Sequence, residues 1–281
     1  MIVVITHPVK SKEYGWRFVD NDEEMPPCKP DILNHKYVSE YYFDSDPSYS
    51  GICSVPFLFD LHTKKIVNNN SDDIVNMFNK LSPLFDYIPK ALLPQIEQMN
   101  AFVDTFRSYV FKAGMAKTQQ RYDENAGLAY YSLDILNMIL STSPYLNGNE
   151  LTKSDLLLFP TIVRFDVGYA CAFHLNLRSI KNSYPFITNW AIRIYNLAPQ
   201  TVNMEHIKLF IFDKDLGWNN SGIIPLGIGI QEEFDNQIKE IFEIPKNAKK
   251  SSKVQAIMKQ YYRNNTLVYM LILLVIVLLF K

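Results

Sequence analysis

The chain has 281 residues, of which 48% are hydrophobic and 20% are charged, so it has the composition of a globular protein with a sizeable core. Collagen-like, low-complexity and wholly disordered chains are excluded. The formal charge of −1 conceals an asymmetry, because seven basic residues and no acidic residue follow position 245, which leaves −8 on residues 1–245. An anionic body is therefore joined to a cationic C-terminal stretch.

The predicted elements of the first part alternate in type. Alternation of apolar residues and the position of turn residues predict a buried strand, an acidic proline-rich loop, a hairpin and a helix, at residues 2–6, 20–30, 55–67 and 71–79. Within the hairpin, the two strands are expected at 55–59 and 65–67. The helix carries Asp72 and Asp73 in its first turn, where the helix dipole favours them. This part is predicted to be a small α/β unit.

After Pro94 the apolar residues recur at three- and four-residue spacing, which is typical of helices. Besides the helix that follows Pro94, further helices are predicted at 117–141, 153–173, 185–197 and 202–212. Thr152 and Asp155 have the spacing of a capping box, and Leu151 and Leu156 that of a hydrophobic staple. The helix that begins there is apolar almost all round, so we expect it to be the buried centre of a helical domain, with a kink at Pro160.

The three cysteines, Cys28, Cys53 and Cys171, are widely spaced, and the five histidines are not clustered. Neither a disulfide framework nor a metal site is predicted. We therefore expect reduced thiols in a reducing compartment, and thiols of this kind are more often buried small apolar side chains than nucleophiles.

Residues 267–280 form an uninterrupted apolar run that ends at Lys281. As a helix this run reaches only about 21 Å of the roughly 30 Å hydrocarbon core, so Asn265 and Thr266 would extend it. A buried core helix is the alternative. We predict a single C-terminal transmembrane anchor at 266–281 after a basic linker at 231–265. The linker's Lys246–Arg263 stretch would face anionic lipid headgroups.

The short span favours a thin organelle membrane, that of the endoplasmic reticulum or a mitochondrion. Nucleic acid is not expected as a partner, because the basic residues lack interleaved aromatic residues until Tyr261 and adjoin the apolar run.

Six strings resemble one protein family in order and spacing: SVPFLFD (54–60), KKIVNNNSDDIVNMFN (64–79), FKAGMAKTQ (111–119), LTKSDLLLFPTIVRFDVGY (151–169), TVNMEHIK (201–208) and SGIIPLG (221–227). They resemble the xi-class glutathione transferases, which are the glutathionyl-hydroquinone reductases. The resemblance covers roughly residues 1–230. It implies a thioredoxin-like domain at 1–88 that lacks its first strand and helix, and a helical glutathione transferase domain at 89–230.

The resemblance also implies a glutathione site. Trp16, Val55, Pro56 and Ser71 match family residues that contact glutathione, with a cis peptide bond before Pro56 and Ser71 at a helix N-terminus, where an anion binds well. Trp16 is alternatively a core residue, and Ser71 alternatively a helix cap. Tyr169 matches a tyrosine on the quinone side, where it would donate to a quinone oxygen, or else it is a core tyrosine.

Several family residues are missing from this sequence. The family's nucleophile lies in a Cys-Pro-Trp-Ala motif, which does not occur here. Cys53 is a weak substitute, because it is on a strand, away from the helix N-terminus that would lower its pKa. Hydrophobic or neutral side chains also replace two charged glutathione partners and three tyrosines of the family, at Ile52, Asn70, Phe111, Ile211 and Phe212.

Two functions are compatible with these residues. The first is a catalytically degenerate, membrane-anchored interaction subunit, in which a protein partner fills the gap in the sheet by strand addition. The second is a glutathione-dependent transferase or glutathionyl-hydroquinone reductase whose N-terminal catalytic segment is missing from this sequence. Glutathione is the expected cofactor of the second function, with weakened binding, and no metal is expected.

Overall fold

The computed structural model describes residues 2–20, 28, 30–81, 86–213, 215, 221 and 223–225, all of which belong to the unit Met1–Phe234. The predicted linker and membrane anchor at 231–281, with the Lys246–Arg263 stretch, lie outside the described residues and stay predictions. Among the helices of the described part, none combines the length and the hydropathy needed to cross a bilayer.

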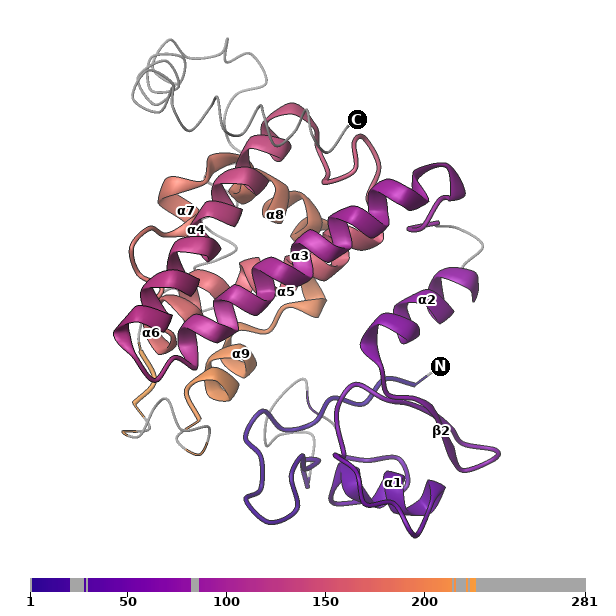
Figure 1. The fold of residues 1–281 in the computed structure, drawn as a ribbon. Coiled ribbons are helices and arrows are strands. Elements are labelled where there is room, and N and C mark those ends of the chain that lie inside the picture. Colours follow the sequence, from indigo (N-terminus) through magenta and orange to yellow (C-terminus); the bar gives the residue numbers. More distant parts are fainter. Residues whose placement is uncertain are drawn as a thin grey trace, which may run out of the picture. The chain divides into compact units, whose positions relative to one another are not determined.

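The N-terminal part contains two helices and a hairpin (Figure 1), namely α1 (Val38–Ser45), β1 (Leu58–Asp60), β2 (Lys65–Asn68) and α2 (Ser71–Leu81). The strands β1 and β2 are antiparallel, with Phe59 opposite Ile66, and they form the one sheet of the described residues. The predicted hairpin and the predicted helix at 71–79 are therefore confirmed, with a shorter first strand and a slightly longer helix.

Helix α1 was not predicted, because its sequence VSEYYFDS is rich in residues of weak helix propensity. Two features stabilise it. Glu40 accepts hydrogen bonds from the backbone N–H groups of Lys36 and Tyr37, each at 2.8 Å. Val38, Tyr41 and Tyr42 are buried in the core of the N-terminal part, where Trp16, Cys53 and Val55 pack against them. Burial therefore overrides the local preference.

The predicted strand at residues 2–6 is wrong, because these residues have no regular structure. Ile2 and Val3 remain 63% and 68% exposed. A strand needs a neighbour for its backbone hydrogen bonds, and no described strand lies beside this segment. Its carbonyl at Thr6 instead accepts hydrogen bonds from the side chains of His206 and Cys28, at 3.1 and 3.2 Å.

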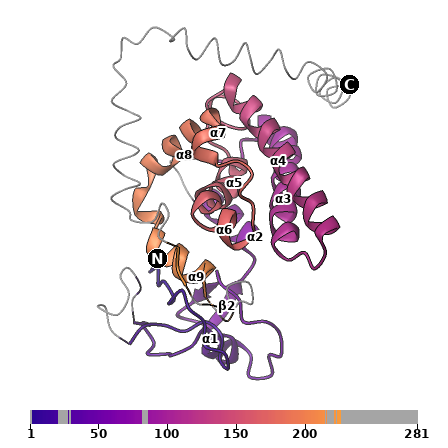
Figure 2. The same ribbon diagram turned by 90° about the vertical axis from the view of Figure 1, so that its left-hand side faces the viewer.

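The rest of the described chain is helical (Figure 1). Its helices are α3 (Leu93–Gly114), α4 (Gln119–Thr142), α5 (Lys153–Arg164), α6 (Ala170–Ala172), α7 (Ile180–Ser183), α8 (Pro185–Leu197) and α9 (Met204–Ile211). The helices predicted at 117–141, 185–197 and 202–212 are confirmed to within two residues at each end, and α3 confirms the helix after Pro94. The helix predicted at 153–173 is divided, because α5 ends at Arg164 and a π-helical segment and α6 follow it. Helix α5 packs against α3 and α8 and lies among the other helices in Figure 2, so the prediction that it forms the buried centre is also confirmed.

The start of α5 forms a polar cluster inside the core. Asp155 is fully buried and accepts hydrogen bonds from the N–H and hydroxyl groups of Thr152, from Leu146 N–H and from the Trp190 indole, all at 2.8–2.9 Å. Burial raises the pKa of this carboxyl, and the four donors oppose that effect. The Asp155 half of the predicted capping box is thus confirmed, and it also ties α5 to α8.

Pro160 lies inside α5, and the departure from α-helical geometry comes after it, in a π-helical segment at Phe165–Tyr169 that leads into α6. Gly168 in this segment faces Ile211 of α9. A Cβ atom at Gly168 would lie 2.3 Å from Ile211 Cδ1, so a larger residue there would require the end of the Ile211 side chain to shift.

Candidate functional site

The segment that leads to Pro56 is held in place by Tyr42 of α1. The peptide bond between Val55 and Pro56 is cis, as the resemblance implied. The buried Tyr42 hydroxyl donates to the Ser54 carbonyl at 2.9 Å and accepts from Ser54 N–H at 3.2 Å. Asn69 Nδ2 also donates to the Tyr42 hydroxyl oxygen, at 3.2 Å. One phenol therefore holds the segment before Pro56 next to the turn before α2, a role that the sequence did not reveal.

The N-terminus of α2 leaves the side chain of Ser71 available to a ligand. Asn70 Oδ1 accepts from the N–H groups of Asp72 and Asp73, at 2.9 and 3.1 Å, so Asn70 is the cap of this helix and the alternative reading of Ser71 as the cap is wrong. Ser71 is exposed, and its hydroxyl makes no hydrogen bond to any other described residue. The residue that replaces the family's glutamate has thus become a capping residue.

Trp16 joins the N-terminal part to α9. Its ring is half-buried and stacks on Phe210, with ring centroids 5.6 Å apart, while Lys10 Nζ lies 4.3 Å from the centroid of the indole ring. Its carbonyl accepts a hydrogen bond from Val38 N–H at 2.9 Å. These contacts give Trp16 a packing role, and its contact with glutathione stays a prediction.

Tyr169 lies in an aromatic cluster on the π-helical segment. It is 5% exposed and stacks on Phe173 at 4.9 Å between centroids, with the edges of Phe111 and Phe165 at 5.7 and 6.5 Å. Burial raises its pKa, which outweighs the opposite effect of two nearby arginines, so the phenol stays protonated. Its hydroxyl makes no hydrogen bond within the described part of the chain and is therefore free to donate.

The two positions where the family has adjacent tyrosines are part of the helical core here. Ile211 and Phe212 are 2% and 4% exposed and belong to the same apolar cluster as Tyr169. Phe111 is different, because 42% of it is exposed beside Tyr169. Of these two neighbouring aromatic side chains, Tyr169 has a hydroxyl group and Phe111 has none.

The surroundings of Cys53 are not those of an activated thiol. Burial raises the pKa of Cys53, which is the opposite of what a nucleophile needs. Cys28 is fully buried, and its thiol donates a hydrogen bond to the Thr6 carbonyl, while Cys171 is exposed on α6. The suggestion that Cys53 replaces the missing nucleophile is therefore not supported by its surroundings.

We expect iodoacetamide at neutral pH to modify Cys171 first and Cys53 more slowly than a free peptide thiol, because a raised pKa leaves less thiolate at a given pH. Cys28 should react last. Mass spectrometry of digested samples, taken over time, measures the three rates. If Cys53 reacted faster than the peptide, it would have to be considered as a nucleophile again.

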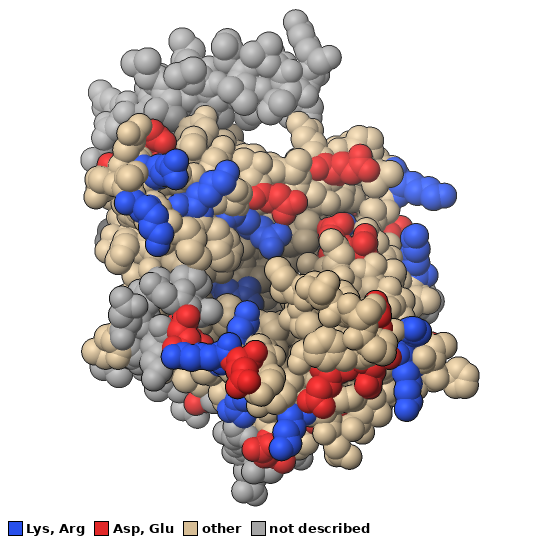
Figure 3. All heavy atoms as spheres, turned by 60° about the horizontal axis from the view of Figure 1, so that its bottom comes forward, with Lys and Arg blue, Asp and Glu red and all other residues tan. Residues whose placement is uncertain are grey.

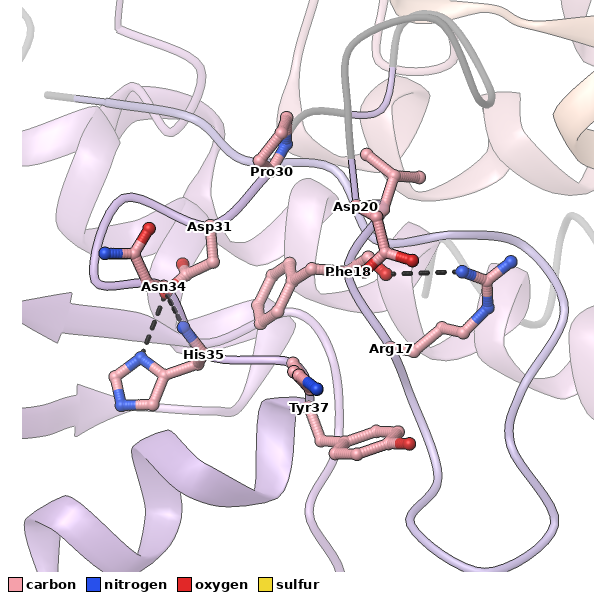
Figure 4. Close-up of a pocket in the computed structure, with 10 residues that line it drawn as sticks. Arg17, Phe18, Asp20, Pro30, Asp31, Asn34, His35 and Tyr37 are labelled. Atoms are coloured by element: carbon pink, nitrogen blue, oxygen red, sulfur yellow. Dashed lines mark hydrogen bonds and ion pairs between the residues drawn. The ribbon is translucent and has the colours of Figure 1, made fainter.

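A separate pocket of about 340 Å³ opens between residues 17–20 and 30–37 (Figure 4). Asp31 in its wall accepts hydrogen bonds from the backbone and the ring of His35, and Arg17 donates to the Phe18 carbonyl. None of the four residues expected to bind glutathione lines it. Among the described residues there is also no cluster of side chains that could hold a metal ion.

The face of the molecule seen in Figure 3 is hollowed near its centre. Several lysine and arginine side chains gather at the upper left of the view, and others lie along its right edge and in its lower part, interspersed with acidic side chains. The excess of negative charge on residues 1–245 therefore does not make this face uniformly acidic.

Comparisons with known proteins give a consistent result, although no family model matches the chain. It is 35% identical over 228 residues to "Glutathione S-transferase omega-like 2" of Schizosaccharomyces pombe, covering 76% of this chain and 72% of the relative. It is 36% identical over 227 residues to the glutathionyl-hydroquinone reductase YqjG of Escherichia coli, covering 76% and 67%.

Solved structures agree with this. The glutathione-bound structure of YqjG matches with a TM-score of 0.75 and 35% identity, covering 80% of this chain and 74% of that one. The glutathione transferase Xi of Phanerochaete chrysosporium matches with a TM-score of 0.74 and 37% identity, covering 80% and 79%. Both likenesses extend over the thioredoxin-like and the helical parts.

Proposed function

This chain belongs to the xi-class glutathione transferases, the family of the glutathionyl-hydroquinone reductases, and on that basis we propose that it binds glutathione and serves glutathione-dependent transfer chemistry. The observation that carries the proposal is the position of the Val55–Pro56 segment beside the N-terminus of α2, where the Ser71 hydroxyl is available. Tyr42 holds both elements through Ser54 and Asn69.

In this proposal each part of glutathione has its own contact. The backbone of Val55 pairs with the tripeptide, as it does in the family. The γ-glutamyl carboxylate lies at the Ser71 hydroxyl, where the dipole of α2 favours an anion. The protonated Tyr169 hydroxyl is available to donate to an oxygen of a quinone-type acceptor.

The transfer step itself needs a thiolate. In the family, a cysteine of low pKa attacks the sulfur of the glutathionyl adduct, and a second glutathione resolves the mixed disulfide. This sequence contains no Cys-Pro-Trp-Ala motif, and the surroundings of Cys53 favour its neutral form. The 281 residues thus supply the glutathione and acceptor sides of such a site, and a reductase activity would need the family's cysteine motif in addition.

Titration calorimetry with reduced glutathione tests the proposal. We expect the wild-type chain to bind, and Ser71→Ala to weaken binding roughly ten- to a hundredfold, because it removes one hydrogen bond to a charged group. Ser179→Ala is the matched control, since Ser179 caps α7 in the helical part and its loss should leave glutathione affinity unchanged. Equal affinity of wild type and Ser71→Ala would contradict the proposed site.

A second candidate is the degenerate interaction subunit at a membrane. The neutral side chains at Ile52 and Asn70 and the surroundings of Cys53 support it, and its partner would be a protein that adds a strand to the sheet. Family membership favours the glutathione-dependent function instead. If the wild-type chain did not bind glutathione, the interaction subunit would become the favoured function.

A further inference from the structure

Lys153, the first residue of α5, connects the helical part to α2. It is 6% exposed, and its Nζ lies 2.6 Å from Asp72 Oδ1 and 2.9 Å from Asn76 Oδ1. Its backbone N–H donates to the Tyr87 carbonyl at 2.8 Å. The side chain of Lys153 thus crosses from one part of the fold to the first two turns of α2.

This is an unfavourable place for a lysine unless it is paired. The N-terminal end of a helix carries partial positive charge, so a cation at the start of α5 is repelled by the dipole of its own helix. An unpaired charge on a buried side chain is also costly. Asp72, whose side chain is 51% exposed, is the carboxylate that compensates this lysine among the described residues.

The pairing matters because of the position of Asp72. It directly follows Ser71 in the first turn of α2, where the proposed function places a ligand carboxylate. Asp72 and Asp73 would both repel that carboxylate. Asp73 contacts the neutral amide of Asn68, at 3.3 Å, whereas Asp72 is neutralised by Lys153. The helical part therefore supplies the cation that removes one of the two repulsive charges.

We propose that Lys153 is a positioning residue for glutathione, which acts through Asp72 by cancelling its charge and by fixing the first turn of α2. This inference rests on the proposed function and deepens it, because it assigns part of the affinity to a residue of the helical domain. Glutathione affinity then depends on the net charge of this pair.

Titration calorimetry at low ionic strength, with reduced glutathione as the probe, tests the inference on three variants of the full chain. Lys153→Met should weaken binding, and Asp72→Asn should strengthen it. Each change should be roughly three- to tenfold, because each variant alters the charge near the ligand carboxylate by one unit. The double variant should bind within about twofold of wild type, since its pair is again neutral. The single-variant differences should shrink when salt is added.

Thermal unfolding of the same variants separates stability from binding. Asp134→Asn is the control, since it breaks the Asp134–Arg178 ion pair elsewhere in the helical part and should leave affinity unchanged. If Lys153→Met lowered the melting temperature but bound glutathione like wild type, or if the double variant bound as weakly as Lys153→Met, the inference would be overturned. If the wild type itself did not bind, the proposed function would fall and this inference with it.

Discussion

Replacement of Asp155 by alanine is expected to lower the free energy of unfolding by about 3–5 kcal/mol. The reason is that this fully buried carboxylate accepts from three residues, and two backbone N–H groups and the Trp190 indole would be left without their acceptor. Urea unfolding followed by the fluorescence of Trp190 and the other tryptophans measures the change.

Asp104→Ala is the control for this prediction. Asp104 forms an ion pair with Arg107 in the next helical turn, but its side chain is 62% exposed, so the expected change is below about 1 kcal/mol. Asp155→Asn provides a second measurement if the alanine variant does not fold, because it keeps the size of the side chain but turns an amide group toward donors. A loss of stability no larger than that of Asp104→Ala would show that the cluster at the start of α5 is unimportant.

The second large effect is a gain of affinity. We expect the double variant Ile52→Arg/Asn70→Glu to bind glutathione roughly a hundredfold or more tightly than wild type, because it restores two charge-assisted hydrogen bonds of about 1.5–3 kcal/mol each. Both positions can accept longer side chains, since Ile52 is 84% exposed and Asn70 is also exposed. Calorimetry with reduced glutathione measures the gain.

The variant also removes the cap of α2, which is expected to lower stability by about 1 kcal/mol. Asn70→Ala therefore serves as the control, because it removes the same cap without adding a carboxylate, and it should not increase affinity. If the double variant bound no more tightly than wild type, positions 52 and 70 would not face the ligand. If affinity rose as expected, these two substitutions would account for the weakened glutathione site.

The helical part could be predicted well because its signals are local. Helix α8 begins and ends at the predicted residues, and the capping pair of Thr152 and Asp155 was recognised from its spacing. Helical hydrogen bonds and caps join residues three or four positions apart, so a short stretch of sequence contains most of the information. The failures, at α1 and at residues 2–6, concern segments whose structure depends on distant neighbours.

The features of the candidate site also divide into those that local sequence predicts and those that depend on distant contacts. The sequence by itself determined the family, the cis Val55–Pro56 segment, the position of Ser71 and the absence of the cysteine motif. Only the tertiary structure decided that Asn70 caps α2, that Tyr42 holds Ser54 beside Asn69, and that Lys153 reaches α2 from 77 positions beyond Asn76. The physical reason is that the burial and pairing of polar groups depend on which distant segments come into contact. No local sequence pattern specifies those contacts.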